Sequence, residues 1–299
     1  MLKILFSFFL LIFSSTKVLS LEKCEWKNID GKPCLIITKT PNSSSYGEKN
    51  INKISITKQD ITNSGALDIN DVLEMVNGLD VFQSGEKGQQ TSIFTRGSES
   101  NHTLVLLNGV AINDQSVTDG LHDFGQDFIS SLQQIDVYKG SSGAHFGPNA
   151  IAGAINLITD IDYNNSYSIG GTDKENFSLN YNSTKITNND WHLNVKGSVN
   201  NNETKSAIAN GKEKDGSKNY QINLNGVKWL NENLKFKSTL YGRKTKADYD
   251  GSATDETGYV SDNKMYTIQT MLDHKTRNSE SNLKAHYHKS FLYLDSNQE

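Results

Sequence analysis

Two regions of the chain differ in the spacing of their apolar residues. Residues 50–160 mix short apolar runs with positions spaced as on a helix, and from residue 163 onwards apolar and polar residues alternate with a period of two. The first pattern predicts a compact mixed α/β domain. The second predicts antiparallel strands with one apolar and one polar face.

In the first region, three apolar runs predict strands, at residues 54–57, 104–107 and 135–138. A helical pattern lies between residues 61 and 78, with Asp68 or Asn70 as its N-cap and Gly78 at its end. Asn108-Gly109 follows the second strand and predicts a turn, because glycine adopts positive φ without strain.

In the second region the alternation recurs at six places: residues 177–181, 191–195, 220–224, 234–240, 266–272 and 283–287. The segments run to about ten residues, the length of a tilted membrane crossing, and we expect the aromatic side chains to lie near strand ends. The polar face carries Lys, Asn and Gln, which suit a wet lumen. These features favour a transmembrane antiparallel β-barrel over a soluble sandwich. The aromatic residues in question are Tyr181, Trp191, Trp229 and Tyr266.

The region holds only about seven strands, whereas a barrel in lipid has to close because an open edge leaves backbone groups unpaired. A barrel of about eight strands is filled by its own side chains and has no room for a domain of this size. We therefore expect the first strands of an incomplete barrel, in an N-terminal fragment of a longer protein.

The start of the chain predicts export. Lys3 precedes an apolar run at residues 4–13, so residues 1–20 are typical of a secretory signal peptide. Cys24 and Cys34 follow; they either close a small disulfide loop or remain free thiols.

The composition and residue spacing argue against several classes of function. The chain has 299 residues and a net charge of −4, with Lys and Glu interspersed, which gives no basic surface for nucleic acid. Its mean hydropathy of −0.56 is low, as expected where only every second strand residue meets lipid. No Ser/His/Asp or paired-carboxylate arrangement has catalytic spacing, so we expect no enzyme and no cofactor needed for chemistry.

Four glycine-containing motifs in the first region resemble the plug domain of TonB-dependent outer-membrane receptors, at residues 93–97, 104–110, 135–140 and 146–156. The resemblance implies a receptor in the Gram-negative outer membrane, in contact with its lipid, that actively takes up a scarce large nutrient. Its partner would be TonB with the inner-membrane energising complex. Arg96, expected in a strand, would tie the plug to acidic groups of the barrel wall or form a salt bridge within the plug.

Upstream, the leader at residues 21–49 contains Leu35, Ile36, Ile37 and Thr38, which resemble the TonB box, within residues 35–40. Alternate β-branched residues suit a strand that adds to the sheet edge of a partner. The alternative is an ordinary first strand of the plug.

Within the family, motifs at residues 240–242, 248–250 and 262–264 resemble those of cobalamin (vitamin B12) receptors. The resemblance implies cobalamin or a related corrinoid as substrate and structural Ca²⁺ in the extracellular loops. The calcium ligands would be Glu213, Asp215, Tyr249, Asp250 and Asp262, since oxygen ligands on flexible loops suit this ion. The substrate contacts would be Gln90, Ser92, Glu99, Val117, Thr118 and Gly251.

This chain departs from the cobalamin pattern at four points, among them one residue inserted before Asp262 and the lack of an acidic ligand between residues 200 and 210. Lys214 lies among the acidic residues, and Glu99 is charged where the family has a neutral residue. The alternative for both sets is ordinary solvated loop residues. Three other functions remain open: a siderophore, haem or other substrate receptor, a passive structural or adhesive barrel, and a secreted β-rich hydrolase.

Overall fold

The computed structural model describes residues 52–296, except 86–87, 114–119, 141–145, 172–175, 188, 204–205, 207–213, 250–258 and 278. The chain divides into two compact units, residues 1–49 and 50–299. The predicted signal peptide, Cys24, Cys34 and the TonB box at residues 35–38 lie outside the described residues.

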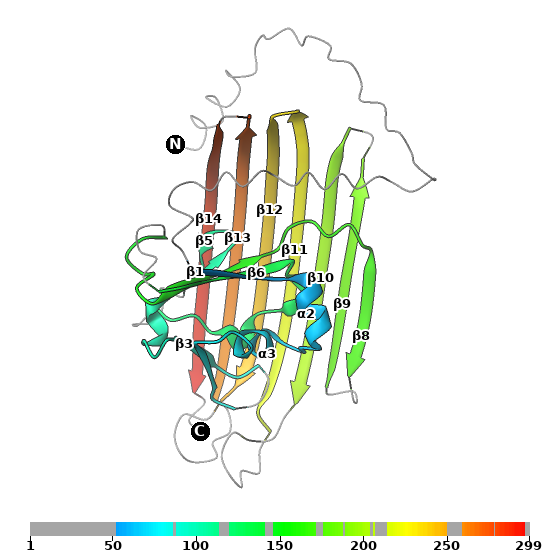
Figure 1. Ribbon diagram of the computed structural model, residues 1–299. Helices are drawn as coiled ribbons and strands as arrows, with labels where there is room; N and C mark the ends of the chain where they lie inside the picture. The colour runs from blue at the N-terminus through cyan, green and yellow to red at the C-terminus, as the bar shows by residue number, and fades with distance from the viewer. Residues whose placement is uncertain are drawn as a thin grey trace, which may run out of the picture. The chain divides into compact units, whose positions relative to one another are not determined.

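The first part of the second unit is a mixed α/β domain, the plug, built on a five-stranded sheet (Figure 1). Its order is β1-β6-β7-β4-β5, and only β4 and β7 pair in parallel. The strands are β1 (Asn52–Thr57), β4 (Thr103–Leu107), β5 (Val110–Ala111), β6 (Gln134–Lys139) and β7 (Gly153–Ile158). All three predicted strands are confirmed.

Short elements cover this sheet. They are the hairpin of β2 (Leu79–Gln83) and β3 (Thr91–Thr95), the helices α2 (Lys58–Ser64) and α3 (Ile69–Glu74), and the 3-10 helices η3 (Ser100–His102), η4 (Phe124–Gln126) and η5 (Ile129–Ser131). Among the described residues, no helix is long and apolar enough to cross a membrane.

The predicted helical segment at residues 61–78 is two helices. Gly65 adopts a left-handed conformation, φ 73°, and ends α2. Asp68 then caps α3 by accepting from the backbone N–H of Asp71, as expected for one of the two proposed caps. The second helix stops at Glu74, before Gly78, which has φ 84°.

The plug core lies between its sheet and α3. Ile69, Leu73, Ile135, Val137 and Ile155 are completely buried, and the same apolar cluster includes Tyr241 and Met265 from the second part of the unit. Burying apolar surface contributes about 25 cal/mol per Å² to stability, so this cluster stabilises the plug. The plug core therefore continues onto the strands that follow.

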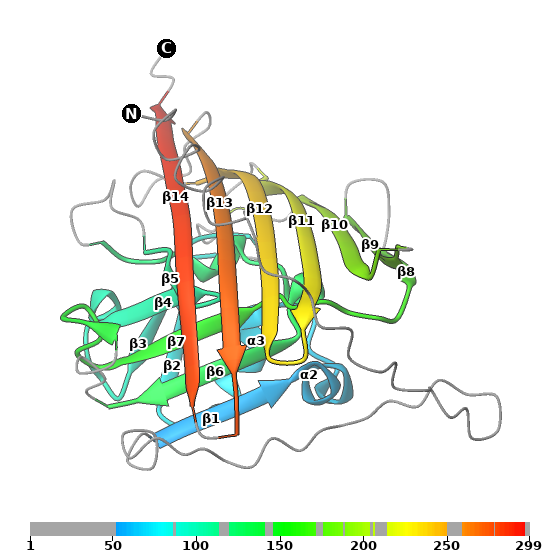
Figure 2. The same ribbon diagram turned by 90° about the horizontal axis from the view of Figure 1, so that it is seen from above.

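The second part is a seven-stranded antiparallel sheet, the wall, in which each strand pairs with the next along the chain (Figures 1 and 2). Its strands are β8 (Ser166–Gly171), β9 (Phe177–Ile186), β10 (Trp191–Glu203), β11 (Gly216–Asn231), β12 (Leu234–Asp248), β13 (Tyr259–Lys275) and β14 (Glu280–Ser296). This confirms the predicted fold class. The sheet is not closed, and β8 and β14 are its edges.

Five of the seven wall strands, β10–β14, are longer than predicted. Strand β9 has 10 residues, but β13 and β14 have 17 each. Alternation marks only the central part of each strand, because paired residues beyond the apolar band have no lipid to face and keep no pattern. Short connections (residues 187–190, 232–233 and 276–279) lie at one end of the sheet, the turn end, and long ones (172–176, 204–215 and 249–258) at the other, the loop end.

The two faces of the wall differ as the alternation predicts. Apolar side chains such as Val195, Ile222 and Ile268 are exposed on the outer face. Polar side chains such as Asn194 and Asn223 are buried on the inner face, which curves around the plug in Figure 2.

The predicted aromatic positions are half correct. Trp191 begins β10 and Trp229 lies near the end of β11, but Tyr181 and Tyr266 lie in the middle of β9 and β13. Alternation shows which face a residue occupies and not its height along the strand.

Candidate functional site

The interface between the plug and the inner face of the wall contains a buried ionic group. Asp127 Oδ2 lies 2.6 Å from His122 Nε2, and its other carboxylate oxygen accepts from Arg243 Nη1. Arg243 also donates to Gln126 Oε1 at 3.1 Å. His122, Gln126 and Asp127 lie within six positions of one another on the plug, around the 3-10 helix η4. Arg243 points inward from β12.

The charges and hydrogen bonds around Asp127 determine its ionisation state. Burial acts to raise the pKa of Asp127, but the charges of His122 and Arg243 and their hydrogen bonds outweigh it, so the pKa of Asp127 lies below its usual value. Burial raises the pKa of the neighbouring Asp123 in spite of hydrogen bonds from Thr91 and Gln126. Asp127 is therefore the ionised partner of Arg243, and the pair joins the plug to the wall.

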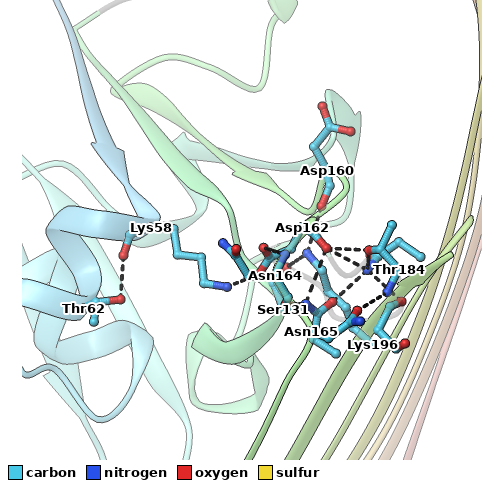
Figure 3. A network of polar contacts seen from close by, with 12 residues as sticks. Lys58, Thr62, Ser131, Asp160, Asp162, Asn164, Asn165, Thr184 and Lys196 are labelled. Atoms are coloured by element: carbon cyan, nitrogen blue, oxygen red, sulfur yellow. Dashed lines mark hydrogen bonds and ion pairs between the residues drawn. The ribbon is translucent and has the colours of Figure 1, made fainter. Parts of the chain in front are cut away.

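A second set of contacts holds the segment that connects the plug to the wall (Figure 3). Lys196 of β10 is only 2% exposed, and its Nζ donates to Ser131 O at 2.9 Å and to Asp160 O at 2.8 Å. Lys58, at the start of α2, pairs with Asp162. A buried ammonium needs acceptors, and here plug carbonyls supply them.

Amide and hydroxyl side chains of the wall complete this anchor. Thr184 and Asn194 donate to Asp162 O, and Asn225 Nδ2 donates to Thr159 O at 2.8 Å. Burial acts to raise the pKa of Asp162, but the bond from Lys58 and the N–H of Asn164 hold it below its usual value. The connecting segment is thus bound on one side to the plug and on the other to β9–β11.

The predicted turn at Asn108-Gly109 forms part of the same interface. Asn108 has φ 51° and Gly109 φ 78°. Lys284 Nζ donates to Asn108 O at 2.9 Å, and Gln269 Nε2 donates to Leu107 O at 2.8 Å. The wall therefore binds the plug mainly through side-chain bonds to plug carbonyls.

The predicted substrate contacts are only partly described. Gln90 is exposed before β3, Ser92 is half-buried in β3 opposite Phe82, and Glu99 is exposed next to η3, beyond the other end of β3. The strand therefore separates Glu99 from Gln90. Val117, Thr118 and Gly251 lie outside the described residues.

Three predicted calcium ligands are described, and all lie at the loop end. Asp215 precedes β11 and is buried, Tyr249 follows β12 and contacts the ring of Tyr259, and Asp262 lies 3.7 Å from Lys264 Nζ. Glu213 and Asp250 are outside the described residues. Within the described residues, no group of three or more His, Cys, Asp or Glu side chains is placed to hold a metal.

The predicted placement of Arg96 in a strand is wrong. The residue lies in the turn after β3 with φ 53°, and its side chain is exposed. The pattern of flanking apolar residues placed it in the strand, but β3 ends at Thr95. Within the described residues, Arg243 and Lys237 are wall cations that pair with plug carboxylates, Asp127 and Asp160.

Sequence reasoning missed Asp127 and Arg243. Their side chains are bonded across 116 positions of the chain, and no local pattern connects them. A signal for the wall lysine was present: Lys196 falls on the polar side of the alternation, and a charged residue on a covered face requires partners.

An α/β plug packed against the polar inner face of an antiparallel sheet is the arrangement of a β-barrel that contains a plug domain. Residues 47–154 match the TonB-dependent Receptor Plug Domain family. The fold is similar to that of a ferric enterobactin receptor mutant from Pseudomonas aeruginosa, with TM-score 0.63, 17% identity, and 82% of this chain and 41% of that chain covered. It is also similar to the ferric yersiniabactin uptake receptor of Yersinia pestis, with TM-score 0.64, 16% identity, and 84% and 43% covered.

A third similar structure is a siderophore receptor of Acinetobacter baumannii, with TM-score 0.62, 16% identity, and 81% of this chain and 37% of that chain covered. The chain thus spans less than half the length of the receptors it matches. The family match thus covers the plug, and the similar solved structures show the fold of plug and wall.

Proposed function

We propose that the chain is part of a TonB-dependent outer-membrane receptor that takes up a scarce, large nutrient actively and performs no covalent chemistry. The observation that carries the proposal is the seating of the plug. Its contacts with the wall include a buried ion pair, Asp127 with Arg243, and hydrogen bonds from Lys196 and Asn225. An interface held by separate polar contacts can switch from one arrangement of these contacts to another.

The proposed mechanism couples binding to release of the plug. Substrate binds at the loop end, and this shifts the exposure of the box at Leu35–Thr38 to TonB. TonB adds a strand to the box by backbone pairing and pulls on it. Because β1 is the first plug strand and an edge of the plug sheet, the pull reaches the plug there.

For the ligand, we propose a ferric siderophore ahead of a corrinoid. The similar solved structures are receptors named for ferric enterobactin, ferric yersiniabactin and siderophores. The corrinoid alternative requires the charged Glu99 to stand where the cobalamin pattern has a neutral residue. It also needs a calcium site of Glu213, Asp215, Tyr249, Asp250 and Asp262, in which Asp262 has Lys246 at 3.9 Å and Lys264 at 3.7 Å as competing cations.

Isothermal titration of the complete receptor in detergent tests the ligand. We expect binding of a ferric siderophore, no binding of cobalamin, and no effect of calcium. Calcium-dependent binding of cobalamin without binding of ferric siderophores would instead establish the corrinoid alternative. Binding of neither class would contradict the proposed substrates altogether.

A further inference from the structure

The outer face of the wall carries a hollow of about 540 Å³, on the side turned away from the plug in Figure 2. Its lining includes Gly197, together with Tyr181 and Ile222, which are the register partners of Gly197 on β9 and β11. A Cβ atom built at Gly197 has no described atom of a non-neighbouring residue within 4 Å, so the space above this glycine is open. We refer to the hollow as the outer groove.

The outer groove is lined mainly by apolar and aromatic side chains. Leu179 and Ile222 are exposed there, and so are the rings of Tyr181, Tyr220 and Tyr266. Outward and inward side chains alternate along a barrel strand, so this set meets hydrocarbon in a membrane. A groove in such a surface fits an acyl chain, because the chain buries apolar surface there and needs no hydrogen-bond partner.

Lys244 provides a positive charge at the loop end of the outer groove. Lys218 of β11, Lys246 of β12 and Lys264 of β13 lie next to it on the same face, and we refer to the four as the lysine cluster. Lys218 is the register partner of Lys246, and Lys244 is the register partner of Lys264. Like charges directly opposite each other destabilise a sheet. An anion placed among these lysines therefore relieves a repulsion that is built into the strands.

Two carboxylates limit the extent of this positive charge. Asp262 Oδ2 lies 3.9 Å from Lys246 Nζ and 3.7 Å from Lys264 Nζ. Asp248, two positions beyond Lys246 toward the loops, accepts from the N–H of Gly216 at 3.2 Å. The lysine cluster therefore lies between the apolar groove and acidic positions of the loop end. A phosphorylated lipid presents its acyl chain and its phosphate in the same order.

The lysine cluster also lies at the edge of the apolar band. Lys218 and Lys228 are ten positions apart on β11, and Ile222 and Leu224 between them are exposed on the same face. Ten residues of strand span about 34 Å, and a tilt of about 40° reduces this to a height of about 26 Å. The apolar band of outer-membrane barrels is about 25 Å tall, so Lys218 lies at the depth of lipid head groups.

We propose that the outer groove and the lysine cluster bind one phosphorylated glycolipid of the outer leaflet, with an acyl chain in the groove and a phosphate group on the lysines. The inference rests on the outer-membrane location of the proposed function, in which the loop end faces the outside. It adds a site that takes no part in ligand uptake. A second copy of the chain fits less well, because a symmetric contact sets the same lysines against each other.

Native mass spectrometry of the complete receptor in detergent, without siderophore, tests the site. The receptor is titrated with bisphosphorylated lipid A, with its monophosphoryl form and with phosphatidylethanolamine, which has acyl chains but no net charge. We expect the bisphosphorylated form to bind about tenfold more tightly than phosphatidylethanolamine, with the monophosphoryl form between them, because each lysine near an anionic head group adds to the attraction.

A first pair of variants tests the groove. Gly197→Phe fills the hollow, and the φ of Gly197 is not positive, so a side chain is tolerated there. Ala285→Phe adds the same ring to the outer face of β14, outside the groove. We expect Gly197→Phe to weaken lipid A binding about tenfold, because the acyl chain loses buried methylene contacts, and Ala285→Phe to weaken it less than about twofold.

A second pair tests the lysines. Lys218→Gln with Lys244→Gln removes two charges of the lysine cluster, and Lys185→Gln with Lys228→Gln removes two outer-face charges near the turn end. We expect the first double variant to bind lipid A about tenfold more weakly. The control should change binding less than about twofold, because salt screens charges that lie farther apart than about 10 Å.

Equal binding of lipid A and phosphatidylethanolamine by the wild type, or equal losses in a variant and its control, would overturn the inference. A dimer that Gly197→Phe abolishes would also overturn it and would assign the groove to a second copy of the chain. Siderophore binding is measured separately. A receptor that binds lipid A selectively but no siderophore therefore contradicts the proposed function and supports this inference.

Discussion

At the residue scale, Asp127 forms a buried ion pair between the plug and the wall. It is 3% exposed and pairs with Arg243, which is 4% exposed. Asp127→Asn leaves the guanidinium buried without a counter-charge, which costs about 3–5 kcal/mol. Urea unfolding of the complete receptor, followed by protease sensitivity of the plug, measures the loss.

The matched control is Asp160→Asn. Asp160 also pairs a plug carboxylate with a wall cation, Lys237 at 3.3 Å, but its side chain is 51% exposed. Exposed pairs contribute about 0–1 kcal/mol. If both variants lose the same stability, Asp127 has no special role in seating the plug.

Acidification should remove the contribution of Asp127. Its pKa is lower in the folded protein than the ordinary value of 3.8. The stability it adds is therefore fully present above 3.8 and is lost as the pH falls through the folded value. The difference in urea midpoint between wild type and Asp127→Asn should shrink on acidification from neutral pH; a difference independent of pH would contradict this charge assignment.

Residue types alone predicted some of the features at the residue scale. Asn108-Gly109 forms the expected turn because positive φ is a local property of those residues. Arg96 was misplaced by one residue beyond a strand end, and the pairing of Asp127 with Arg243 is set by tertiary structure.

At the scale of elements, the segment between β7 and β8 is held by Lys196. Lys196→Met keeps the apolar stem and leaves Ser131 O and Asp160 O without this donor. Each unpaired buried carbonyl costs roughly 1–3 kcal/mol. Amide hydrogen exchange in residues 159–165 should accelerate.

Lys228→Met is the control for this change. Lys228 also stems from a wall strand, but its Nζ lies over the Trp191 ring at 5.7 Å and binds no plug carbonyl among the described contacts. A cation–π contact of this kind is worth about 0.5–1 kcal/mol. Exchange in residues 159–165 that stays unchanged in Lys196→Met would show that other contacts hold the segment.

The sequence predicted the type of these elements better than their ends. Period-two alternation placed β9–β14 because one face meets lipid and the other the plug. The helix at residues 61–78 divided because Gly65 and Asp68 supply a stop and a new cap within four residues, which apolar spacing does not report.

At the scale of the whole molecule, the fold class followed from the change of period and from the plug motifs. The way the plug sits on the wall did not, because it depends on contacts such as Gln89 with Asp248 O, 159 positions apart. The seven wall strands form an open sheet with β8 and β14 as its edges.

The central proposal is that the complete protein is a receptor energised through a TonB box at residues Leu35–Thr38. The most direct test is uptake of a radiolabelled ferric siderophore by cells that produce the complete receptor with or without residues Leu35–Thr38. Deletion should leave binding within about twofold of wild type, because the box lies outside the ligand site. Uptake should fall to that of cells lacking the receptor, whereas unchanged uptake would contradict the account and favour a passive barrel.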